Sequence, residues 1–198
     1  MKTIAALYVE TDGCYFGLDG VEPWDIKRDA RTYDGPHPVV AHPPCKRWGR
    51  MARMMYATHG HEHLRPGNDG GCFKAALDAV RKWGGVLEHP AGTQAFREFG
   101  IPRPFMGAWH RTICGGWVTE VAQCQYGHKA RKLTWLYLHA AAPPSLDWRC
   151  EGYTHMIGPL RKGVDTDLQA LSRKENLATP QAFRDILIKM ARSVEVKP

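Results

Sequence analysis

The sequence predicts an α/β fold in which one mostly parallel sheet lies between two layers of helices, giving three layers in a single domain. Two short apolar runs that end in proline turns predict buried strands at residues 39–41 and 86–88. Between them, residues 72–83 carry apolar side chains at the helical spacing, and Asn68–Gly71 can cap that helix. A strand, a crossover helix and a further strand form a parallel pair, which is the basis of the prediction.

The other elements follow from the same patterns over residues 1–198, which we treat as one domain. In chain order we expect a strand at 3–9, a turn-rich segment to 38, a helix at 46–57, strands near 117–123 and 133–139, a loop-rich segment at 145–178 and a last helix at 179–193. Thr179 is expected to cap the last helix, with Pro180 in its first turn. Its predicted buried face carries Phe183, Ile186, Leu187 and Met190.

The composition indicates a folded, basic protein. Its residues are 43% hydrophobic and 10% aromatic, which is typical of a globular domain and excludes a disordered chain. No apolar run is long enough to span a membrane and no apolar signal segment follows Met1, so we expect a cytoplasmic protein without a membrane partner. The net charge of +7, concentrated at residues 46–53 and 129–132, favours a polyanionic partner. The cysteines are scattered, which favours free thiols.

The turn after residues 39–41 carries the first candidate for catalysis. Pro43 and Pro44 fix the backbone there and refuse strand pairing, so Cys45 is presented on a stiff turn at a strand end. Open α/β sheets place their chemistry at this edge. The neighbouring cations are expected to favour the nucleophilic thiolate, and they are Lys46, Arg47 and Arg50. The alternative is a small buried cysteine beside a structural turn.

A second segment repeats this arrangement. The strand at 86–88 ends in Glu88, His89 and a turn at Pro90. Two strands that each deliver reactive side chains just before a proline turn predict two walls of one site. We therefore expect Cys45 and Glu88 to face a shared pocket at the carboxyl ends of neighbouring parallel strands. The alternative for Glu88 is an ordinary exposed carboxylate.

In their order along the chain, these motifs resemble the cytosine carbon-5 DNA methyltransferases, especially the short phage and prophage members. Pro43-Pro44-Cys45 resembles the loop that carries the family nucleophile, and Glu88-His89-Pro90 the loop that carries its acid. Residues 124–136 resemble the phage group's Gln-x-x-x-Gly-His…Lys-x-Thr-x-Leu segment, and residues 178–183 its Thr-Pro-x-x-Phe-Ala helix start. Across about residues 38–193, the resemblance implies a Rossmann-like transferase domain in a bacterial or phage-infected cell.

The resemblance also implies a mechanism. Cys45 would add to carbon 6 of a cytosine ring, and Glu88 would protonate ring nitrogen 3, helped by His89 and by burial that raises the pKa of Glu88. The partner would be DNA, with the target base flipped out of the stack, or a pyrimidine nucleotide. The methyl donor would be S-adenosylmethionine, held by Glu10, Asp12, Gly13 and Gly17. Phosphate or substrate contacts would come from Arg47, Arg50, His128, Arg131 and Lys132.

Two further readings stay open because the opening segment lacks the close glycine spacing of the family's cofactor loop. One is another reaction on the same scaffold, such as base excision or transfer of a different group. The other is a catalytically inactive DNA-binding relative. The alternating histidines His59, His61 and His63 resemble metal ligands, but no second ligand cluster accompanies them, so we predict no metal site.

Overall fold

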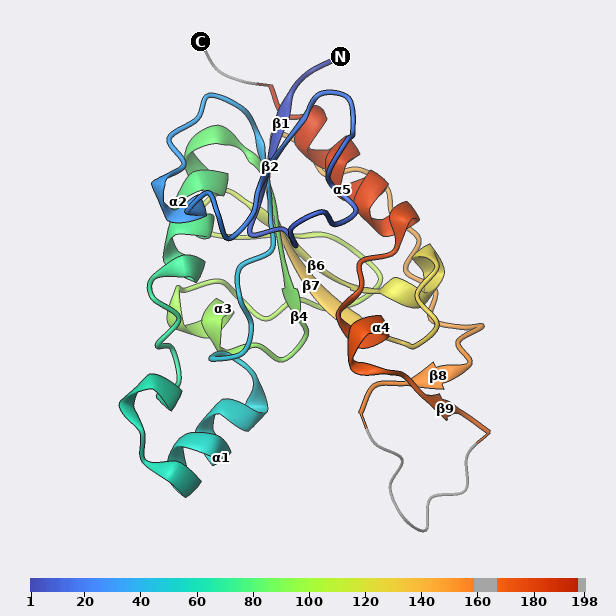
Figure 1. Ribbon diagram of the computed structural model, residues 1–198. Coiled ribbons are helices and arrows are strands. Elements are labelled where there is room, and N and C mark those ends of the chain that lie inside the picture. The colour runs from blue at the N-terminus through green and yellow to red at the C-terminus, as the bar shows by residue number, and fades with distance from the viewer. Residues whose placement is uncertain (159–166, 196–198) are drawn as a thin grey trace.

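The structure is a computed structural model that describes residues 1–158 and 167–195, apart from the side chain of Arg50 (Figure 1). It is a mixed α/β fold built on a seven-stranded, mostly parallel sheet in the order β2-β1-β3-β4-β7-β6-β5. This confirms the predicted α/β class and the predicted mostly parallel sheet. The strands are β1 Ile4–Leu7, β2 Val21–Trp24, β3 Val39–Ala41, β4 Gly85–Pro90, β5 His110–Arg111, β6 Trp117–Ala122 and β7 Leu133–His139.

Strands β2, β1, β3 and β4 run parallel and form one half of the sheet. The chain moves outward from β1 to β2 and then returns to place β3 on the other side of β1, so the strand order reverses between β1 and β3. Such a reversal opens a crevice at the carboxyl ends of the two strands, where α/β sheets bind ligands. Pairing of β3 with β4 sets Ala41 opposite Leu87, so the segments that carry Cys45 and Glu88 leave the same sheet edge.

The other half of the sheet is antiparallel. Strand β7 pairs antiparallel with β4, β6 with β7, and β5 with β6. The β4–β7 register sets Glu88 opposite Leu136 and His89 opposite Trp135. Side chains alternate between the two faces of a strand, so Glu88 and His89 point to opposite faces of the sheet.

Two hydrophobic clusters cover the two faces of the sheet. On one face, helix α2 (Cys72–Trp83) contacts β3, β4 and β7 through buried residues such as Phe73 and Leu77. On the other, helix α5 (Gln181–Arg192) contacts β1, β3 and β4 through Phe183 and Leu187. Figure 1 shows the two helices on either side of the sheet. The alternating apolar residues of the strands therefore fill both clusters.

The remaining elements are short. They are α1 Arg50–His59, α3 Gln94–Glu98, α4 Arg173–Leu177, the 3-10 turns η1 Ala30–Thr32, η2 Glu62–Leu64 and η3 Gln123–Tyr126, and the paired strands β8 His155–Met156 and β9 Gln169–Ala170. No helix among the described residues is long and apolar enough to cross a membrane.

Element boundaries differ from the prediction in three places. Strand β2 lies inside the segment predicted to be turns, because an edge strand tolerates Pro23. The helix predicted to begin at residue 46 begins at Arg50, after a turn closed by the Trp48 amide donating to the Cys45 carbonyl. The last helix begins at Gln181 with Pro180 at its cap position, one residue later than predicted, and on its predicted buried face Ile186 is only partly buried.

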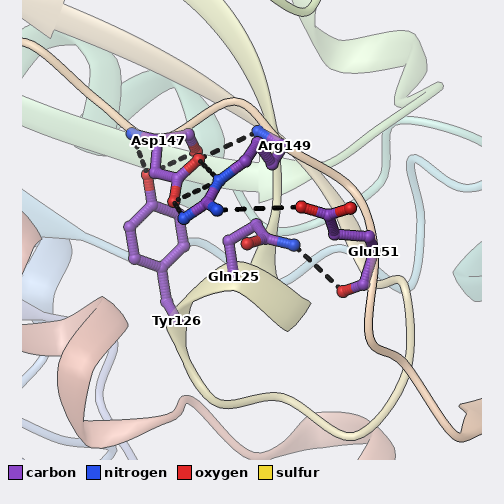
Figure 2. A network of polar contacts seen from close by, with 5 residues as sticks. All are labelled: Gln125, Tyr126, Asp147, Arg149 and Glu151. Carbon is purple, nitrogen blue, oxygen red and sulfur yellow. Dashed lines mark hydrogen bonds and ion pairs between the residues drawn. The ribbon is translucent and has the colours of Figure 1, made fainter.

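The loop-rich segment after residue 145 is fixed to η3 by a polar network (Figure 2). The Tyr126 hydroxyl donates to the Asp147 carbonyl at 2.8 Å and accepts from the Asp147 amide at 3.0 Å. Arg149 pairs with the Asp147 carboxylate at 2.6 Å, and the Gln125 amide donates to the Glu151 carbonyl at 3.0 Å. These contacts hold the chain beside the residues that follow β6.

Candidate active site

Glu88 and His42 lie together at the carboxyl ends of β4 and β3. His42 directly follows β3, and its Nδ1 lies 3.0 Å from Oε2 of Glu88. Its Nε2 lies 2.8 Å from the hydroxyl of Tyr15, which comes from the loop after β1. Burial raises the pKa of Tyr15, so the phenol keeps its proton and donates to Nε2. The other nitrogen, Nδ1, therefore carries the proton that His42 donates to Glu88.

Glu88 is ionised in this arrangement. Burial alone would raise the pKa of its carboxyl, but the hydrogen bond from His42 and the positive charge of Lys132 outweigh burial and hold the pKa below its usual value. The acid role expected of Glu88 works better with a raised pKa, and the net shift has the opposite sign. The reason is His42, whose contact with Glu88 depends on the pairing of β3 with β4.

Gln123 completes the surroundings of Glu88. Its Nε2 donates to the Thr134 hydroxyl at 2.8 Å and lies 3.5 Å from Oε1 of Glu88. Gln123 is only 1% exposed, and its Oε1 is buried without a hydrogen-bond partner among the described residues. A buried acceptor without a donor costs about 1–3 kcal/mol, so a donor that reached this oxygen would stabilise the protein.

Cys45 lies within the electrostatic reach of Glu88 and Lys132. Burial, and next the Glu88 charge, raise the pKa of the Cys45 thiol, while the Lys132 charge opposes them. The favourable cation among the described side chains is thus Lys132, which follows η3 in the chain, and not Lys46 or Arg47 as expected. Lys132 is held beside the site by donating to the Ala178 carbonyl at 2.9 Å. Burial lowers the pKa of the Lys132 ammonium, although the negative charges of Glu88 and Cys45 act to raise it.

His89 lies apart from this cluster. It points to the α2 face, is 1% exposed, and packs edge-on against Phe73 with ring centroids 5.2 Å apart. Burial lowers the pKa of His89 to about 4, although Glu88 and the Pro44 carbonyl act in the other direction. Neither ring nitrogen makes a hydrogen bond of good geometry among the described residues. His89 is therefore a neutral core side chain in the free protein.

The residues expected to contact phosphate do not form one group among the described side chains. Arg131 and Lys132 line one cavity of about 310 Å³, and of the two only Lys132 acts on the pKa of Glu88. Arg131 is exposed and Arg47 half-buried. The side chain of Arg50 lies outside the described residues. His128 is buried and bonds to backbone groups: Nδ1 lies 3.0 Å from both the amide nitrogen and the carbonyl oxygen of Ala130, and Nε2 lies 3.2 Å from the Glu175 carbonyl.

The residues expected to hold a cofactor form the loop after β1. Glu10 and Asp12 are exposed. The Gly13 amide donates to the Glu10 carbonyl at 3.0 Å, and a Cβ on Gly13 would lie 2.8 Å from that oxygen, so this glycine is needed for the turn itself. Gly17 has a φ of +72° and open space around it. The loop reaches the Glu88 cluster through Tyr15, and it lies where the strand order reverses.

Four residues of this edge were not among the predicted site residues. Tyr15 and Gln123 come from distant segments and carried no local signal, whereas His42 belongs to the same motif as Cys45 and could have been included. Asp25 follows β2 at the same sheet edge and accepts from the Thr11 hydroxyl at 2.7 Å, which lowers its pKa. The described residues contain no group of three or more histidine, cysteine or acidic side chains that could hold a metal ion.

Comparisons of the chain with protein-family models, with curated proteins and with solved structures find no match.

Proposed function

We propose that the protein modifies a pyrimidine base, in DNA or in a nucleotide, through a covalent adduct with Cys45, on a three-layer Rossmann-like scaffold like that of the cytosine carbon-5 DNA methyltransferases its motifs resemble. The observation that carries the proposal is the grouping of Cys45, Glu88 and Lys132 at the carboxyl ends of β3 and β4, where Glu88 and Lys132 affect the ionisation of Cys45 and of each other. A nucleophile, a carboxylate and a cation are the groups that addition to a pyrimidine requires.

The addition starts from a state in which Cys45 holds its proton and Glu88 does not. As the sulfur bonds to ring carbon 6, the thiol proton passes to Glu88 and from there to ring nitrogen 3, which gains the electron pair displaced from the ring. Carbon 5 becomes a nucleophilic enamine carbon. After carbon 5 has attacked an electrophile, its proton passes to water, the Cys45 thiolate departs, and nitrogen 3 returns its proton through Glu88 to Cys45, which restores the aromatic ring and the resting enzyme.

Lys132 and His42 have supporting roles in this scheme. The ammonium of Lys132 stabilises the negative charge on sulfur as the proton leaves Cys45 and again when the adduct breaks, because it is the cation that opposes the rise in the Cys45 pKa. His42, fixed by Tyr15, holds Glu88 in one orientation and keeps it ionised until the ring arrives. Gln123 then has Oε1 available to accept from the exocyclic amino group of cytosine, which uracil and thymine lack.

The cofactor part of the proposal rests on the loop after β1. When bound, S-adenosylmethionine would supply the methyl group for carbon 5. Glu10 and Asp12 fit this group in position and charge, since exposed carboxylates at the strand-order reversal can bind its ammonium and hydroxyl groups. Gly13 serves the turn and Gly17 leaves the backbone open. A rise in melting temperature with S-adenosylmethionine, lost in Asp12→Ala, tests this part separately.

One observation favours a second candidate, cleavage of the glycosidic bond that joins a base to its sugar. The ionised Glu88, with its hydrogen bond from His42, does not depend on Cys45 for its position. A carboxylate can stabilise the positive charge that develops on the sugar in such a reaction. In that case Cys45→Ser would keep full activity and Glu88→Gln alone would lose it.

The proposal is tested with an oligonucleotide containing 5-fluorocytosine, incubated with the protein and S-adenosylmethionine. Fluorine cannot leave carbon 5 as hydrogen does, so the enzyme stays attached to the ring. Intact-protein mass spectrometry should show one oligonucleotide per chain. A proteolytic digest should place it on the peptide that contains Cys45. Cys45→Ser should form no adduct, while Cys150→Ser, a control at another partly buried free cysteine, should form it normally.

A further inference from the structure

Cys124 and Cys150 lie beside each other, although they come from separate segments of the chain. Cys124 belongs to η3, and Cys150 to the loop-rich segment that follows β7. The side chain of Cys150 acts on that of Cys124 through a hydrogen bond and through its charge, so the two sulfur atoms are close. Both are free cysteines and neither is fully buried, so a small solute can reach the pair. Two thiols in this position can be joined by a disulfide bond.

The residues next to the two cysteines hold the two segments together (Figure 2). Gln125 follows the first cysteine and Glu151 the second, and the Gln125 side chain donates to the Glu151 carbonyl at 3.0 Å. The hydroxyl of Tyr126, the next residue of η3, bonds to both the carbonyl and the amide of Asp147, at 2.8 and 3.0 Å. The closeness of the two thiols is therefore set by the folded backbone and its polar contacts, and not by one side-chain rotamer.

The two thiols also influence each other's protons. Burial raises the pKa of Cys124, and the charge of Cys150 and the hydrogen bond with it raise the pKa further. Two thiolates at this separation repel each other, so one sulfur keeps its proton when the other ionises. A thiolate beside a protonated thiol is the pair from which a disulfide forms, because the first sulfur is oxidised and the second attacks it.

Cys114 provides a contrast, because it is a reactive thiol with neighbours of another kind. It is exposed. Burial acts to raise its pKa, but hydrogen bonds from Thr112 and Tyr137 and the charge of Arg81 outweigh burial and lower it. These hydroxyl and guanidinium groups stabilise a thiolate but cannot close a disulfide. Oxidation of Cys114 should therefore stop at a sulfenic acid or link two molecules.

We propose that Cys124 and Cys150 are a redox-active pair, which a peroxide converts to an intramolecular disulfide and which small thiols reduce again. One sulfur takes an oxygen atom from hydrogen peroxide, becomes a sulfenic acid and releases water. The second thiol attacks that sulfur, the sulfur–oxygen bond breaks and a second water leaves. The two thiols lose two electrons and two protons in all, and the peroxide gains them. The pair operates independently of the chemistry proposed for Cys45.

The disulfide acts on the neighbourhood of Glu88 through Gln123, the residue before Cys124. The Gln123 amide donates to the Lys132 carbonyl at 3.0 Å, and its side-chain Nε2 lies 3.5 Å from Oε1 of Glu88. A covalent bond at Cys124 fixes η3 to the loop-rich segment and so restricts the residue that borders Glu88. Oxidation thus makes this wall of the candidate site more rigid.

The test counts free thiols by alkylation and mass spectrometry, after brief treatment of the dilute protein with hydrogen peroxide. It is made in Cys114→Ser, because Cys114 reacts with peroxide and shares a tryptic peptide, residues 112–129, with Cys124. With six cysteines less one, this protein should take up five alkyl groups when reduced and three when oxidised. Dithiothreitol should restore five. Without reduction, a tryptic digest should show residues 112–129 linked to residues 150–161.

The variants Cys124→Ser and Cys150→Ser, each made in Cys114→Ser, should give no linked peptide. Cys72→Ser, a control at another partly buried free cysteine, should still give it. Equal melting temperatures of the reduced proteins will show that all are folded. The proposal is overturned by a link between other cysteines, by the same loss of thiols in Cys150→Ser, or by five free thiols at a peroxide dose that oxidises Cys114 in the wild type.

Hydrogen exchange measures the effect of the disulfide on the candidate site. The amides of residues 123–126 should exchange more slowly in the oxidised protein than in the reduced protein, and equally in reduced and peroxide-treated Cys150→Ser. Unchanged exchange in a protein that has formed the disulfide would overturn the part assigned to Gln123.

Discussion

His42 and Glu88 form a hydrogen-bonded pair across two neighbouring parallel strands, with Nδ1 3.0 Å from Oε2. The pair joins the end of β3 to the end of β4, where the turn that carries Cys45 begins. It also explains why a nearly buried carboxyl, with 13% of its side chain exposed, stays ionised. Glu88 therefore depends on His42 for its charge as well as for its position.

Loss of His42 should change how the stability of the protein depends on pH. The folded-state pKa of Glu88 is lowered, so Glu88 stabilises the fold above its usual pKa of 4.5, and this contribution is lost as the pH falls through the lower folded-state pKa. In His42→Leu the burial that raises the pKa is no longer opposed by the hydrogen bond, so the contribution at neutral pH should shrink or change sign. Urea unfolding of wild type, His42→Leu, Glu88→Gln and the double variant measures it.

The double variant should be more stable than the sum of the single losses predicts, by about 1–3 kcal/mol at pH 7. His63→Leu, at an exposed histidine outside the site, is the control and should change little. Additive losses from His42→Leu and Glu88→Gln would show that the two side chains are not coupled.

Replacement of Gln123 should destabilise the protein more than its size suggests. Gln123→Leu removes the donor to Thr134 and the amide beside Glu88, leaving buried polar groups without partners. We expect a loss of about 1–3 kcal/mol in the free energy of unfolding, measured in urea. Gln125→Leu, which removes one bond to the Glu151 carbonyl at the surface, should cost less than half as much. Equal losses would mean that Gln123 contributes only ordinary packing.

The strands near the site could be predicted from the sequence, but the contacts between side chains within the site could not. The apolar runs before Cys45 and Glu88, and the helix between them, predicted a parallel pair, because each pattern is local and both strands are buried. Strand β2 was not predicted, since Pro23 is compatible with a strand only at a sheet edge, and edge position is a property of the whole sheet. Gln123 and Lys132 reach Glu88 from the other half of the sheet, and Tyr15 reaches it only through His42, so no local pattern encodes these contacts.

His89 should make the protein less stable at mildly acidic pH. Its pKa is about 4 in the folded chain against 6.5 for the free side chain, so the unfolded chain binds a proton first as the pH falls. Between pH 6.5 and pH 4 this should remove roughly 3 kcal/mol of stability. His89→Leu should remove this part of the pH dependence without lowering stability at pH 7, as measured by unfolding in urea at both ends of the range. An unchanged pH dependence in His89→Leu would contradict the assignment.

Gly85 should be irreplaceable at the start of β4. Its φ is +117°, and a Cβ would lie 2.0 Å from the Val39 carbonyl oxygen in the neighbouring strand. Gly85→Ala should therefore cost about 3 kcal/mol or more and separate β3 from β4. Gly100→Ala is the matched control, since its φ is +67° but nothing lies within 4 Å of the new atom, so only the backbone cost of about 1 kcal/mol applies. If Gly85→Ala and Gly100→Ala lowered the melting temperature equally, the close approach to the Val39 carbonyl would not be the reason that Gly85 is needed.

The most direct test of the covalent mechanism is exchange of the hydrogen on cytosine carbon 5 with solvent, because it needs no group donor. Addition of Cys45 at carbon 6 makes carbon 5 accept a deuteron from heavy water. Loss of the original carbon 5 proton to solvent, with release of the thiolate, then leaves deuterated cytosine. An oligonucleotide is incubated with the protein in heavy water and digested to nucleosides, whose masses are measured by mass spectrometry. The mechanism predicts a gain of one mass unit in cytidine with the wild type and none with Cys45→Ser. No exchange by the wild type under conditions where it binds the oligonucleotide, or undiminished exchange by Cys45→Ser, would contradict it.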